Sequence, residues 1–389
     1  MSKTEWKEYK LGEITDSCLG KMLDAKKNRG TPQPYLANVN VRWGSFDLDD
    51  LPLMRFEESE SERYGLKFGD IVVCEGGEPG RRAIWKDQVP NMKIQKALHR
   101  VRCHENVDYR FLYYYLLWAG KKGLFDQYCT GSTIKHLPGG KLKILPIRIP
   151  PLAEQQRIAK ILSSLDDKIE LNNAINRNLE EQTQAIFKSW FIDFEPFGGE
   201  MPEDWKLSSL SNIADYLNGL AMQKFRPKDE EVGLPVLKIK ELRQGFAGED
   251  AELCSPNIKS EYIVNDGDVF FSWSGSLLVD LWCGGKCGLN QHLFKVTSQK
   301  FDKWFYYLWT KHHLYHFVFL ASDKATTMGH IKREELDKAE VCIPTKADYN
   351  KIGSSLEPMI ETIIAKRVEN QRLTLLRNKL LPKLMSNSQ

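Results

Sequence analysis

The most constraining feature of the sequence is that it repeats itself once. Residues 69–71 (Gly-Asp-Ile) recur as residues 267–269 (Gly-Asp-Val), and Ile149-Pro150 recurs as Ile343-Pro344. The separation of matched motifs drifts only from about 201 residues (Pro34 to Pro235) to 194 (Ile149 to Ile343). Other matched pairs, in the same order, are Trp6 with Trp205, Leu98 with Leu293, Tyr113 with Tyr306, and Thr133 with Thr327. This self-similarity predicts two units of one fold, and 389 residues suffice for each unit to bury its own core.

Each repeat ends in a segment whose apolar residues recur every seven positions. The recurring residues form two rows, which are the a and d positions of a heptad pattern. We therefore expect two long helices, each with an apolar seam along one face. The first seam consists of Ile158, Leu162, Leu165, Ile169, Asn172, Asn176, Leu179 and Ile186, and the second of Ile352, Leu356, Met359, Ile363, Lys366, Asn370, Leu373 and Leu380.

Polar residues occupy the middle of both seams, with Asn172 and Asn176 in the first and Lys366 and Asn370 in the second. In an antiparallel pair the two middles meet, so these groups can satisfy one another and set the register. Residues 151–195 carry 5 Lys/Arg against 8 Asp/Glu, whereas residues 346–389 carry 8 against 4. The pattern favours an antiparallel coiled coil over the alternative of two separate helices, each packed on its own domain.

A helix from about residue 154 to residue 192 would span on the order of 55–60 Å. An antiparallel pair of such helices holds two globular domains apart and relates them by a pseudo-twofold axis. Duplex DNA has the same symmetry, and twofold proteins read half-sites about one helical turn, roughly 34–36 Å, or more apart. The pair is therefore suited to act as a ruler between two reading domains.

Composition restricts the class of protein further. The net charge of +3 is close to neutral, so any basic surface has to be local. The sequence has no long apolar run and no basic-then-apolar leader after Met1, which predicts a soluble, cytoplasmic protein. Its eight cysteines are expected to be reduced thiols. Cys283 and Cys287 lack a second ligand pair at zinc spacing, so no metal site is expected.

Three stretches resemble a known family. Residues 150–159 (Pro-Pro-Leu-Ala-Glu-Gln-Gln-Arg-Ile-Ala), 187–194 (Phe-Lys-Ser-Trp-Phe-Ile-Asp-Phe) and 201–205 (Met-Pro-Glu-Asp-Trp) are similar to the central part of the specificity subunits of type I restriction-modification systems. The duplicated plan of that family covers the whole chain. The second copy departs from the pattern, with Lys-Ala-Asp-Tyr-Asn-Lys-Ile at residues 346–352. Whether both helices would bind their partners alike is therefore left open.

The resemblance implies an α+β fold with two pseudo-twofold-related target recognition domains, mostly β with some helix. Two long helices forming an antiparallel coiled coil separate these domains. The implied plan is residues 1–150 for the first target recognition domain, 151–197 for the first spacer helix, 198–345 for the second domain and 346–389 for the second spacer helix.

The resemblance also implies what such a chain does and with which partners. It would be a non-catalytic subunit that reads a split, asymmetric target in double-stranded DNA, one half-site per domain. Two modification subunits would dock on the helices and methylate adenine, and restriction subunits would add an ATP-dependent nuclease. S-adenosylmethionine, ATP and magnesium would belong to those partners, so no cofactor is expected in this chain.

Two kinds of loop are candidates for DNA contact in each repeat. The glycine loops are residues 75–82 and 273–276; glycine lets the backbone approach a groove, and arginine can bond guanine or phosphate. The threonine loops are residues 130–136 and 325–332, which keep a hydroxyl, a small residue and a cation in both copies. The candidate contacts are Gly77, Arg81, Arg82, Ser132, Thr133, Lys135 and His136 in the first repeat, and Trp273, Ser274, Ser276, Thr326, Thr327, His330 and Lys332 in the second.

Plainer interpretations exist for these features. The glycine loop also fits a surface turn with solvated arginines, and Thr133 and Thr327 also fit turn caps. Aromatic helices around Tyr113 and Trp304 are more typical of core packing than of base stacking. The sequence has no Gly-x-x-x-x-Gly-Lys-Ser/Thr loop and no Asn/Asp-Pro-Pro-aromatic motif, so neither ATP hydrolysis nor adenine methylation is expected here. A coiled-coil scaffold that joins two protein-binding domains, without DNA specificity, is the alternative function.

Overall fold

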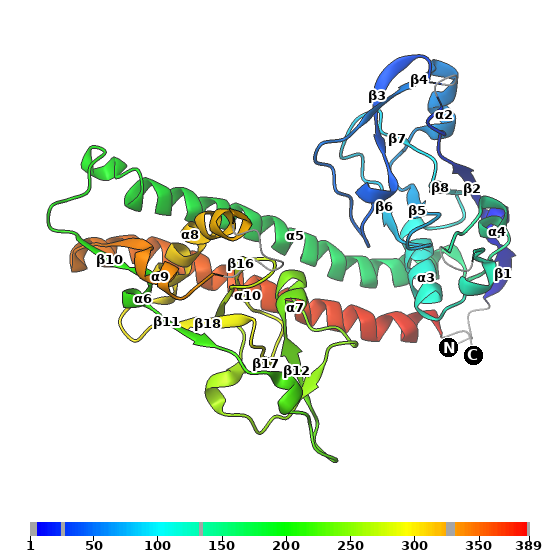
Figure 1. Cartoon of the computed structure of the whole chain (residues 1–389). Coiled ribbons are helices and arrows are strands. Elements are labelled where there is room, and N and C mark those ends of the chain that lie inside the picture. The colour runs from blue at the N-terminus through cyan, green and yellow to red at the C-terminus, as the bar shows by residue number, and fades with distance from the viewer. Residues whose placement is uncertain (1–5, 25–27, 132–134, 324–330, 387–389) are drawn as a thin grey trace. The chain divides into compact units, whose positions relative to one another are not determined.

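The two repeats fold into similar arrangements of strands. The computed structural model describes residues 6–24, 28–131, 135–323 and 331–386. The chain divides into two units, Met1–Asp166 with Leu375–Gln389, and Asp167–Thr374. Two long helices, α5 (Leu152–Phe191) and α10 (Lys346–Met385), each contribute to both units (Figure 1). The predicted mixed α+β fold is confirmed.

A four-stranded antiparallel sheet forms the centre of the first unit. Its strands run in the order β2 (Thr15–Leu19), β8 (Leu98–Cys103), β5 (Ile71–Cys74) and β6 (Arg82–Ile84). All four residues of β5 are buried, which explains its unbroken apolar sequence. The remaining strands form a sheet of β4 (Leu53–Phe56), β3 (Thr31–Leu36) and β7 (Lys93–Ile94), and a pair of β1 (Lys7–Lys10) with β9 (Pro146–Ile149).

The helices of this unit are short except for α3 (Tyr109–Lys121). Asp108 caps α3 by accepting hydrogen bonds from the backbone N–H groups of Arg110 and Phe111, as aspartate commonly does at a helix start. The others are α1 (Leu11–Ile14), α2 (Ser61–Tyr64) and α4 (Gly139–Lys143), with the 3₁₀ turns η1 (Asn38–Asn40), η2 (Glu58–Glu60) and η3 (Asp126–Tyr128).

The second unit repeats this plan. Its central antiparallel sheet has the order β11 (Asp215–Asn218), β18 (Leu293–Thr297), β15 (Val269–Ser272) and β16 (Leu278–Leu281). The second sheet consists of β13 (Leu253–Cys254), β12 (Leu234–Leu237), β17 (Cys287–Leu289) and β14 (Ile263–Val264), and β10 (Lys206–Ser209) pairs with β19 (Glu340–Ile343). The helices are α6 (Leu210–Ile213), α7 (Ile239–Gln244), α8 (Lys303–Asp323) and α9 (Glu334–Lys338), with η4 (Glu195–Phe197), η5 (Met222–Lys224) and η6 (Ser260–Tyr262).

Strand register assigns each position of one unit a counterpart in the other. In the first unit Val72 of β5 faces Arg100 of β8, and in the second Phe270 of β15 faces Lys295 of β18. The backbone N–H of Leu11 donates to the carbonyl of Leu145, and that of Leu210 donates to Ala339 in the same way. Residues at equal distances from these pairs are therefore structural equivalents.

Each unit buries its own core against part of both long helices. In the first, Phe111 and Leu112 of α3 share a cluster with Ile158 of α5 and Leu381 of α10. In the second, Trp304 and Phe305 of α8 share a cluster with Phe191 of α5 and Ile352 of α10. The aromatic helices are thus core elements, with Tyr114 2% and Trp304 1% exposed.

Helices α5 and α10 pair antiparallel within each unit. In the first unit Asp166 accepts a hydrogen bond from Arg377 (2.6 Å). In the second, the Asn172 amide donates to Glu369 and Asn370 (2.9 Å each). As the residue number increases along α5, the number of its partner on α10 decreases. The predicted antiparallel pairing is therefore confirmed. Every residue of the two predicted seams is buried or half-buried.

Each of the two long helices has 40 residues. Helix α5 ends at Phe191, within one residue of the expected end at 192, and Phe194 adopts a left-handed conformation (φ 50°) that redirects the chain. Helix α10 continues through Gly353 and Pro358. A Cβ on Gly353 would lie 3.0 Å from the indole nitrogen of Trp304, so glycine lets that buried ring approach the helix.

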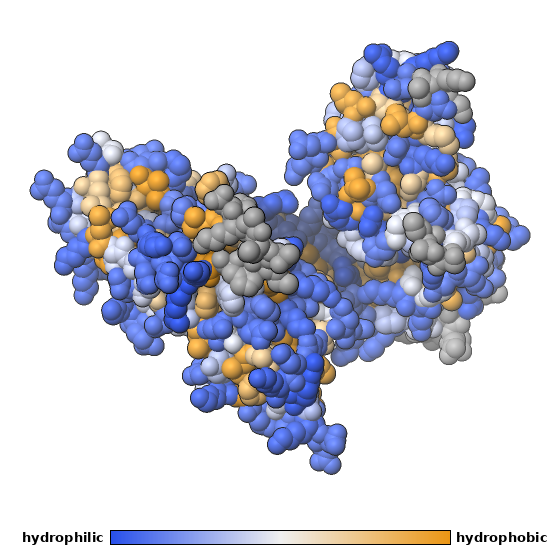
Figure 2. All heavy atoms as spheres, in the orientation of Figure 1, coloured by the Kyte–Doolittle hydropathy of each residue, from blue (hydrophilic) through white to orange (hydrophobic). Residues whose placement is uncertain are grey.

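The face drawn in Figure 2 is mostly hydrophilic, with hydrophobic side chains gathered in small separate groups. None of the helices in the described ranges is long and apolar enough to cross a membrane.

Candidate nucleic-acid interface

The glycine loop of the first unit connects β5 to β6 and is fastened to a neighbouring segment. The Asn38 amide donates to the carbonyl of Gly76 (2.9 Å), and the Trp43 indole donates to Glu78 (2.8 Å). Gly77 has a φ of 75°, a conformation that residues with a Cβ rarely adopt. The turn therefore needs glycine there, and its neighbours hold it in one shape.

The two arginines that follow this turn have different environments. Arg81 is 19% exposed; its guanidinium donates to the carbonyl and side-chain oxygens of Asn38 (3.0 and 3.1 Å) and pairs with Glu78 (3.3 Å). Arg82 is 1% exposed, and its guanidinium lies over the rings of Trp43 (5.2 Å) and Phe125 (5.4 Å). Burial lowers the pKa of Arg82 to about 10.

Arg82 is therefore a core residue, and the expectation that it contacts DNA is corrected. Its Nε and one terminal nitrogen are buried without a hydrogen-bond partner among the described residues. Aromatic faces can hold a cation in this way. Trp43 and Phe125, which hold Arg82, are distant from it in the sequence, so the loop sequence alone does not reveal its burial.

The threonine loop of the first unit lies directly beside the glycine loop. Gly76 forms an isolated bridge with His136, and the backbone N–H of Leu137 donates to the carbonyl of Glu75 (2.7 Å). Lys135 and His136 are exposed, and Lys135 pairs with Asp126 (3.3 Å). The candidates Ser132 and Thr133 lie outside the described residues. The structure thus brings together two loops that are more than fifty residues apart in the sequence.

The second unit juxtaposes its loops in the same way. The backbone N–H of Ile331 donates to the carbonyl of Trp273 (3.0 Å), the equivalent of the contact between Leu137 and Glu75. Gly275, the counterpart of Gly77, also has a left-handed φ, of 67°. Ser276 and Lys332 are exposed. Thr326, Thr327 and His330 lie outside the described residues.

Two candidates in the second glycine loop are held by neighbours. The Trp273 indole donates to Asn218 (3.0 Å). Ser274 is 3% exposed, and its hydroxyl shares a hydrogen bond with Nδ1 of His292 (3.0 Å). Ser274 therefore supports the loop from inside and does not present its hydroxyl to solvent, which corrects the expectation for this residue.

Sequence reasoning missed the residues that fasten the glycine loops. Asn38 and Trp43 do so in the first unit, and Asn218 and His292 in the second. Trp43 is also 47% exposed beside the loop, which makes it a further candidate contact. The sequence offered only the pair Trp43-Gly44 as a signal, and this pair lies far from the loop along the chain.

An arginine of α10 links each domain to the long helices. In the first unit Asp166 of α5 accepts hydrogen bonds from Tyr114 of α3 (2.6 Å) and from Arg377 (2.6 Å). In the second unit Arg367 donates to Asp280 of β16 and to Glu180 of α5, at 2.7 Å each. These arginine links fix each domain on the helix pair within its own unit.

The cysteines were the candidate metal ligands of the sequence. All eight cysteines are free, and burial raises the pKa of Cys283 and Cys287 to about 12. Within the described ranges, no group of three or more His, Cys, Asp or Glu is arranged to hold a metal ion.

Known proteins resemble this chain over nearly its whole length. Residues 3–181 and 202–375 match the family described as Type I restriction modification DNA specificity domain. The MjaIX specificity subunit of Methanocaldococcus jannaschii is 27% identical over 98% of this chain and 96% of its own length. The EcoKI specificity subunit of Escherichia coli is 26% identical over 67% of this chain and 58% of its own length.

A solved structure supports the fold. The S subunit of a type I restriction-modification system from M. genitalium superposes with a TM-score of 0.59 at 16% identity, covering 99% of this chain and 97% of that one. The family match spans both repeats and most of the chain. The chain therefore belongs to the type I restriction-modification DNA specificity family, whose members recognise DNA and are themselves non-catalytic.

Proposed function

We propose that this chain reads a bipartite, asymmetric target in double-stranded DNA, with one half-site per recognition domain. The observation that carries the proposal is the paired loops, which meet at the same place in both units through equivalent backbone hydrogen bonds. A duplicated scaffold with unlike residues in equivalent loops is suited to read two different sequences. Residues 1–150 and 198–345 would be the two recognition domains, and residues 151–197 and 346–389 the spacers.

The loops offer the groups that DNA recognition uses. Gly77 and Gly275 allow close approach of the backbone, and Arg81, Lys135 and His136 supply donors for bases or phosphates. In the second domain Ser276 and Lys332 are the exposed equivalents. Arg81 and Lys135 are paired with Glu78 and Asp126 in the free chain. Binding would exchange those carboxylates for phosphates or base edges.

The long helices would set the gap between the half-sites and dock the partners. The antiparallel contacts at the levels of Asp166 and Asn172 support a defined register of the pair. Two modification subunits would bind there and methylate one adenine per half-site, after flipping it out of the stack. S-adenosylmethionine would be held by those subunits, and ATP and magnesium by restriction subunits. This chain would position the duplex.

The test is to co-express the chain with the modification subunit of its own system, purify the complex, and map adenine methylation on random DNA by long-read sequencing. A split motif with a fixed gap is the expected result. A stable complex that methylates nothing would favour a scaffold without DNA specificity and contradict the proposal. A catalytically inactive modification subunit, purified in parallel, controls for methylation by the host.

Loop exchange tests the assignment of the loops. Replacing residues 75–81 and 130–136 with the loops of another specificity subunit should change the first half-site alone and keep the gap and the second half-site. Methylation mapping of the exchanged chain measures all three. An unchanged motif would mean that other residues read the DNA.

A further inference from the structure

A charged hollow lies beside the central sheet of the first domain. It has a volume of about 620 Å³ and is open to solvent, and every lining residue except Gly12 has a polar or charged side chain. Five cations line it, against the two carboxylates Asp16 and Glu62. Pockets for small metabolites are mostly apolar, so this hollow suits an anionic ligand.

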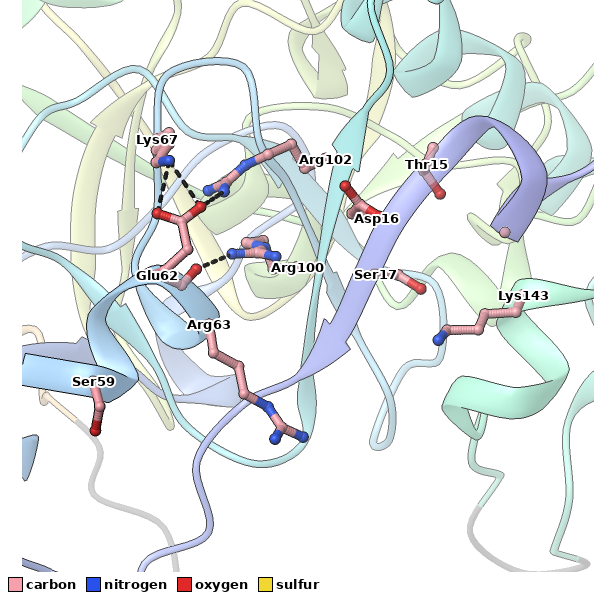
Figure 3. A pocket seen from close by; sticks show the side chains of 11 residues that line it. Thr15, Asp16, Ser17, Ser59, Glu62, Arg63, Lys67, Arg100, Arg102 and Lys143 are labelled. Carbon is pink, nitrogen blue, oxygen red and sulfur yellow. Dashed lines mark hydrogen bonds and ion pairs between the residues drawn. The ribbon is translucent and has the colours of Figure 1, made fainter. Parts of the chain in front are cut away.

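Three of the five cations, Arg63, Lys143 and Arg100, have no carboxylate partner within the described residues. Arg63 of α2 and Lys143 of α4 are exposed and form no ion pair within the described part of the chain. Figure 3 shows them reaching toward the same space from opposite sides of β2, with Ser17 between them. Lys67 and Arg102 are paired with Glu62, at 2.9 and 3.1 Å. The hollow therefore keeps two uncompensated cations at its rim.

A buried arginine forms part of the wall. Arg100 is 7% exposed and donates from one terminal nitrogen to the carbonyl of Glu62 (2.7 Å). Its Nε is buried and has no hydrogen-bond partner among the described residues. The positive charge of this guanidinium adds to the attraction of the hollow for an anion.

The second domain lacks this charge at four of the five equivalent positions; the exception is Lys295, the counterpart of Arg100, which pairs with Asp268 (2.8 Å). Arg102 faces Asp16 across the sheet, and its counterpart Thr297 faces Asp215. The backbone N–H of Lys67 donates to Asp70, and that of Asn265 donates to Asp268. Asn265 is therefore the counterpart of Lys67 and carries no charge.

The two cations at the rim are replaced by acids in the second domain. Lys143 lies two residues before Leu145, and Asp337 lies two residues before Ala339, the counterpart of Leu145. Arg63 precedes Gly65 by two residues. Gly65 pairs with Lys93, and Ile263 pairs with Gly288, which occupies the equivalent position in the second domain. Glu261 lies two residues before Ile263 and is therefore the counterpart of Arg63. The fold thus does not require cations at these two positions, so the exposed rim cations distinguish the first domain from the second.

We propose that this hollow binds a phosphate of the DNA backbone and anchors the first recognition domain without reading sequence. The proposal rests on the DNA-reading function proposed above. A phosphodiester would be held by Arg63 and Lys143, with the positive charge of Arg100 in the wall beside them. Phosphate contacts of this kind position a protein on the duplex and carry no sequence information.

The test measures how DNA affinity depends on salt for the chain assembled with its modification subunits. In the double variant Arg63→Glu with Lys143→Asp, the first domain receives the residues that the second domain already has, so folding should be preserved. We expect the slope of log K against log salt to fall by about one per lost contact, and affinity to weaken alike for specific and unrelated duplexes. The methylated motif should not change.

The reverse double variant, Glu261→Arg with Asp337→Lys, is the matched control for net charge. It should not restore the slope when combined with the first pair, because Thr297 and Asn265 leave the second site incomplete. Specific binding with an unaltered slope in the first variant would refute the hollow as a phosphate site while leaving DNA reading intact. Loss of all sequence preference in the wild-type complex would instead refute the proposed function.

Titration of the wild-type chain with inorganic phosphate distinguishes the two sources of the anion. Binding of free phosphate that disappears in the double variant, together with an unchanged DNA salt slope, would assign the hollow to a small anion and overturn the proposal.

Discussion

At the scale of residues, neighbouring side chains of one type have opposite roles. Arg81 lies at the surface of the glycine loop, whereas Arg82 is enclosed between Trp43 and Phe125. We predict that Arg81→Ala weakens specific DNA binding by about 1–3 kcal/mol, the value of a bidentate base contact. Arg82→Met should leave specific affinity unchanged. Binding isotherms on the mapped target measure both, and a loss of specificity in folded Arg82→Met would contradict the assignment.

The same pair makes a prediction about stability. Arg82 places a cation in an aromatic core and forms no ion pair with any residue that the structure describes. Replacing a buried charge by an apolar residue of similar volume is often neutral or stabilising. The free energy of unfolding of Arg82→Met should therefore be higher than that of the wild type or lie within about 1 kcal/mol of it. Arg82→Ala is the comparison, because it leaves a cavity and should lower stability. Denaturant midpoints of the three proteins decide the point.

His313 of α8 makes stability depend on pH. Burial lowers the pKa of His313 to about 4, although its ring nitrogen donates to the carbonyl of Glu340 (2.8 Å). In the unfolded chain the pKa is about 6.5, so between these values the unfolded state binds a proton and the folded state does not. Stability is full above pH 6.5 and falls as the pH drops toward 4.

The variant His313→Gln should lose less stability between pH 7.5 and pH 5 than the wild type does, since glutamine can still donate to Glu340 without titrating. Denaturant midpoints at the two pH values give the difference. His316→Gln, an exposed neighbour on the same helix, is the control. Equal losses in His313→Gln and the wild type would show that other groups dominate the acid response.

At the scale of elements, the sequence predicted the parts better than their packing. Heptad rows predicted both long helices, because helical periodicity is local, and the antiparallel pairing that they favoured brings the polar middles together. The heptad did not show that Phe187 and Phe191, which lie off the seam, enter the core of the second domain. Packing of this kind depends on distant segments, so periodicity carries no trace of it.

The candidate site shows the same division. Repeat matching identified both loop pairs, and their adjacency became visible only through backbone bridges such as Gly76 with His136. The burial of Arg82 and Ser274 depends on partners elsewhere in the chain, such as Trp43 and His292. The assignment of individual DNA contacts stays a prediction, and Arg81, Lys135, His136, Ser276 and Lys332 are its exposed or half-buried members.

The arginine links offer a test of how domains are held on the helices. Arg367→Ala would leave Glu180 and Asp280 without their shared cation in a half-buried environment, and Arg367 is 25% exposed. We expect the free energy of unfolding to fall by about 1–3 kcal/mol. Arg372→Ala, an exposed arginine on the same helix, should change it by no more than about 0.5 kcal/mol. Chemical denaturation measures both, and equal effects would deny the link a structural role.

At the scale of the whole molecule, the proposed ruler predicts that gap and sequence preference are separable. Seven residues can be inserted between Lys168 and Asn172 of α5, and seven more between Asn370 and Thr374 of α10. Because each insertion is one heptad, the a and d positions of both helices still face each other. The pair lengthens by about 10 Å, so the preferred gap should grow by about three base pairs while both half-sites stay the same. Methylation mapping reads all three quantities.

A three-residue insertion at the same places is the control, because it turns the seams out of phase and should abolish assembly. A heptad variant that assembles and methylates with the original gap would show that the helices do not measure the distance.

The division of both long helices between the units also has a consequence for synthesis. The first unit is completed by residues from Leu375 onward, which leave the ribosome only after all of Asp167–Thr374 has been made. At 5–20 residues per second this delay is on the order of 10–40 s. During that time Ile158 and Leu162, which end up buried beside Leu381, have no α10 to cover them. These apolar residues therefore stay without their α10 partners until the second unit has been translated.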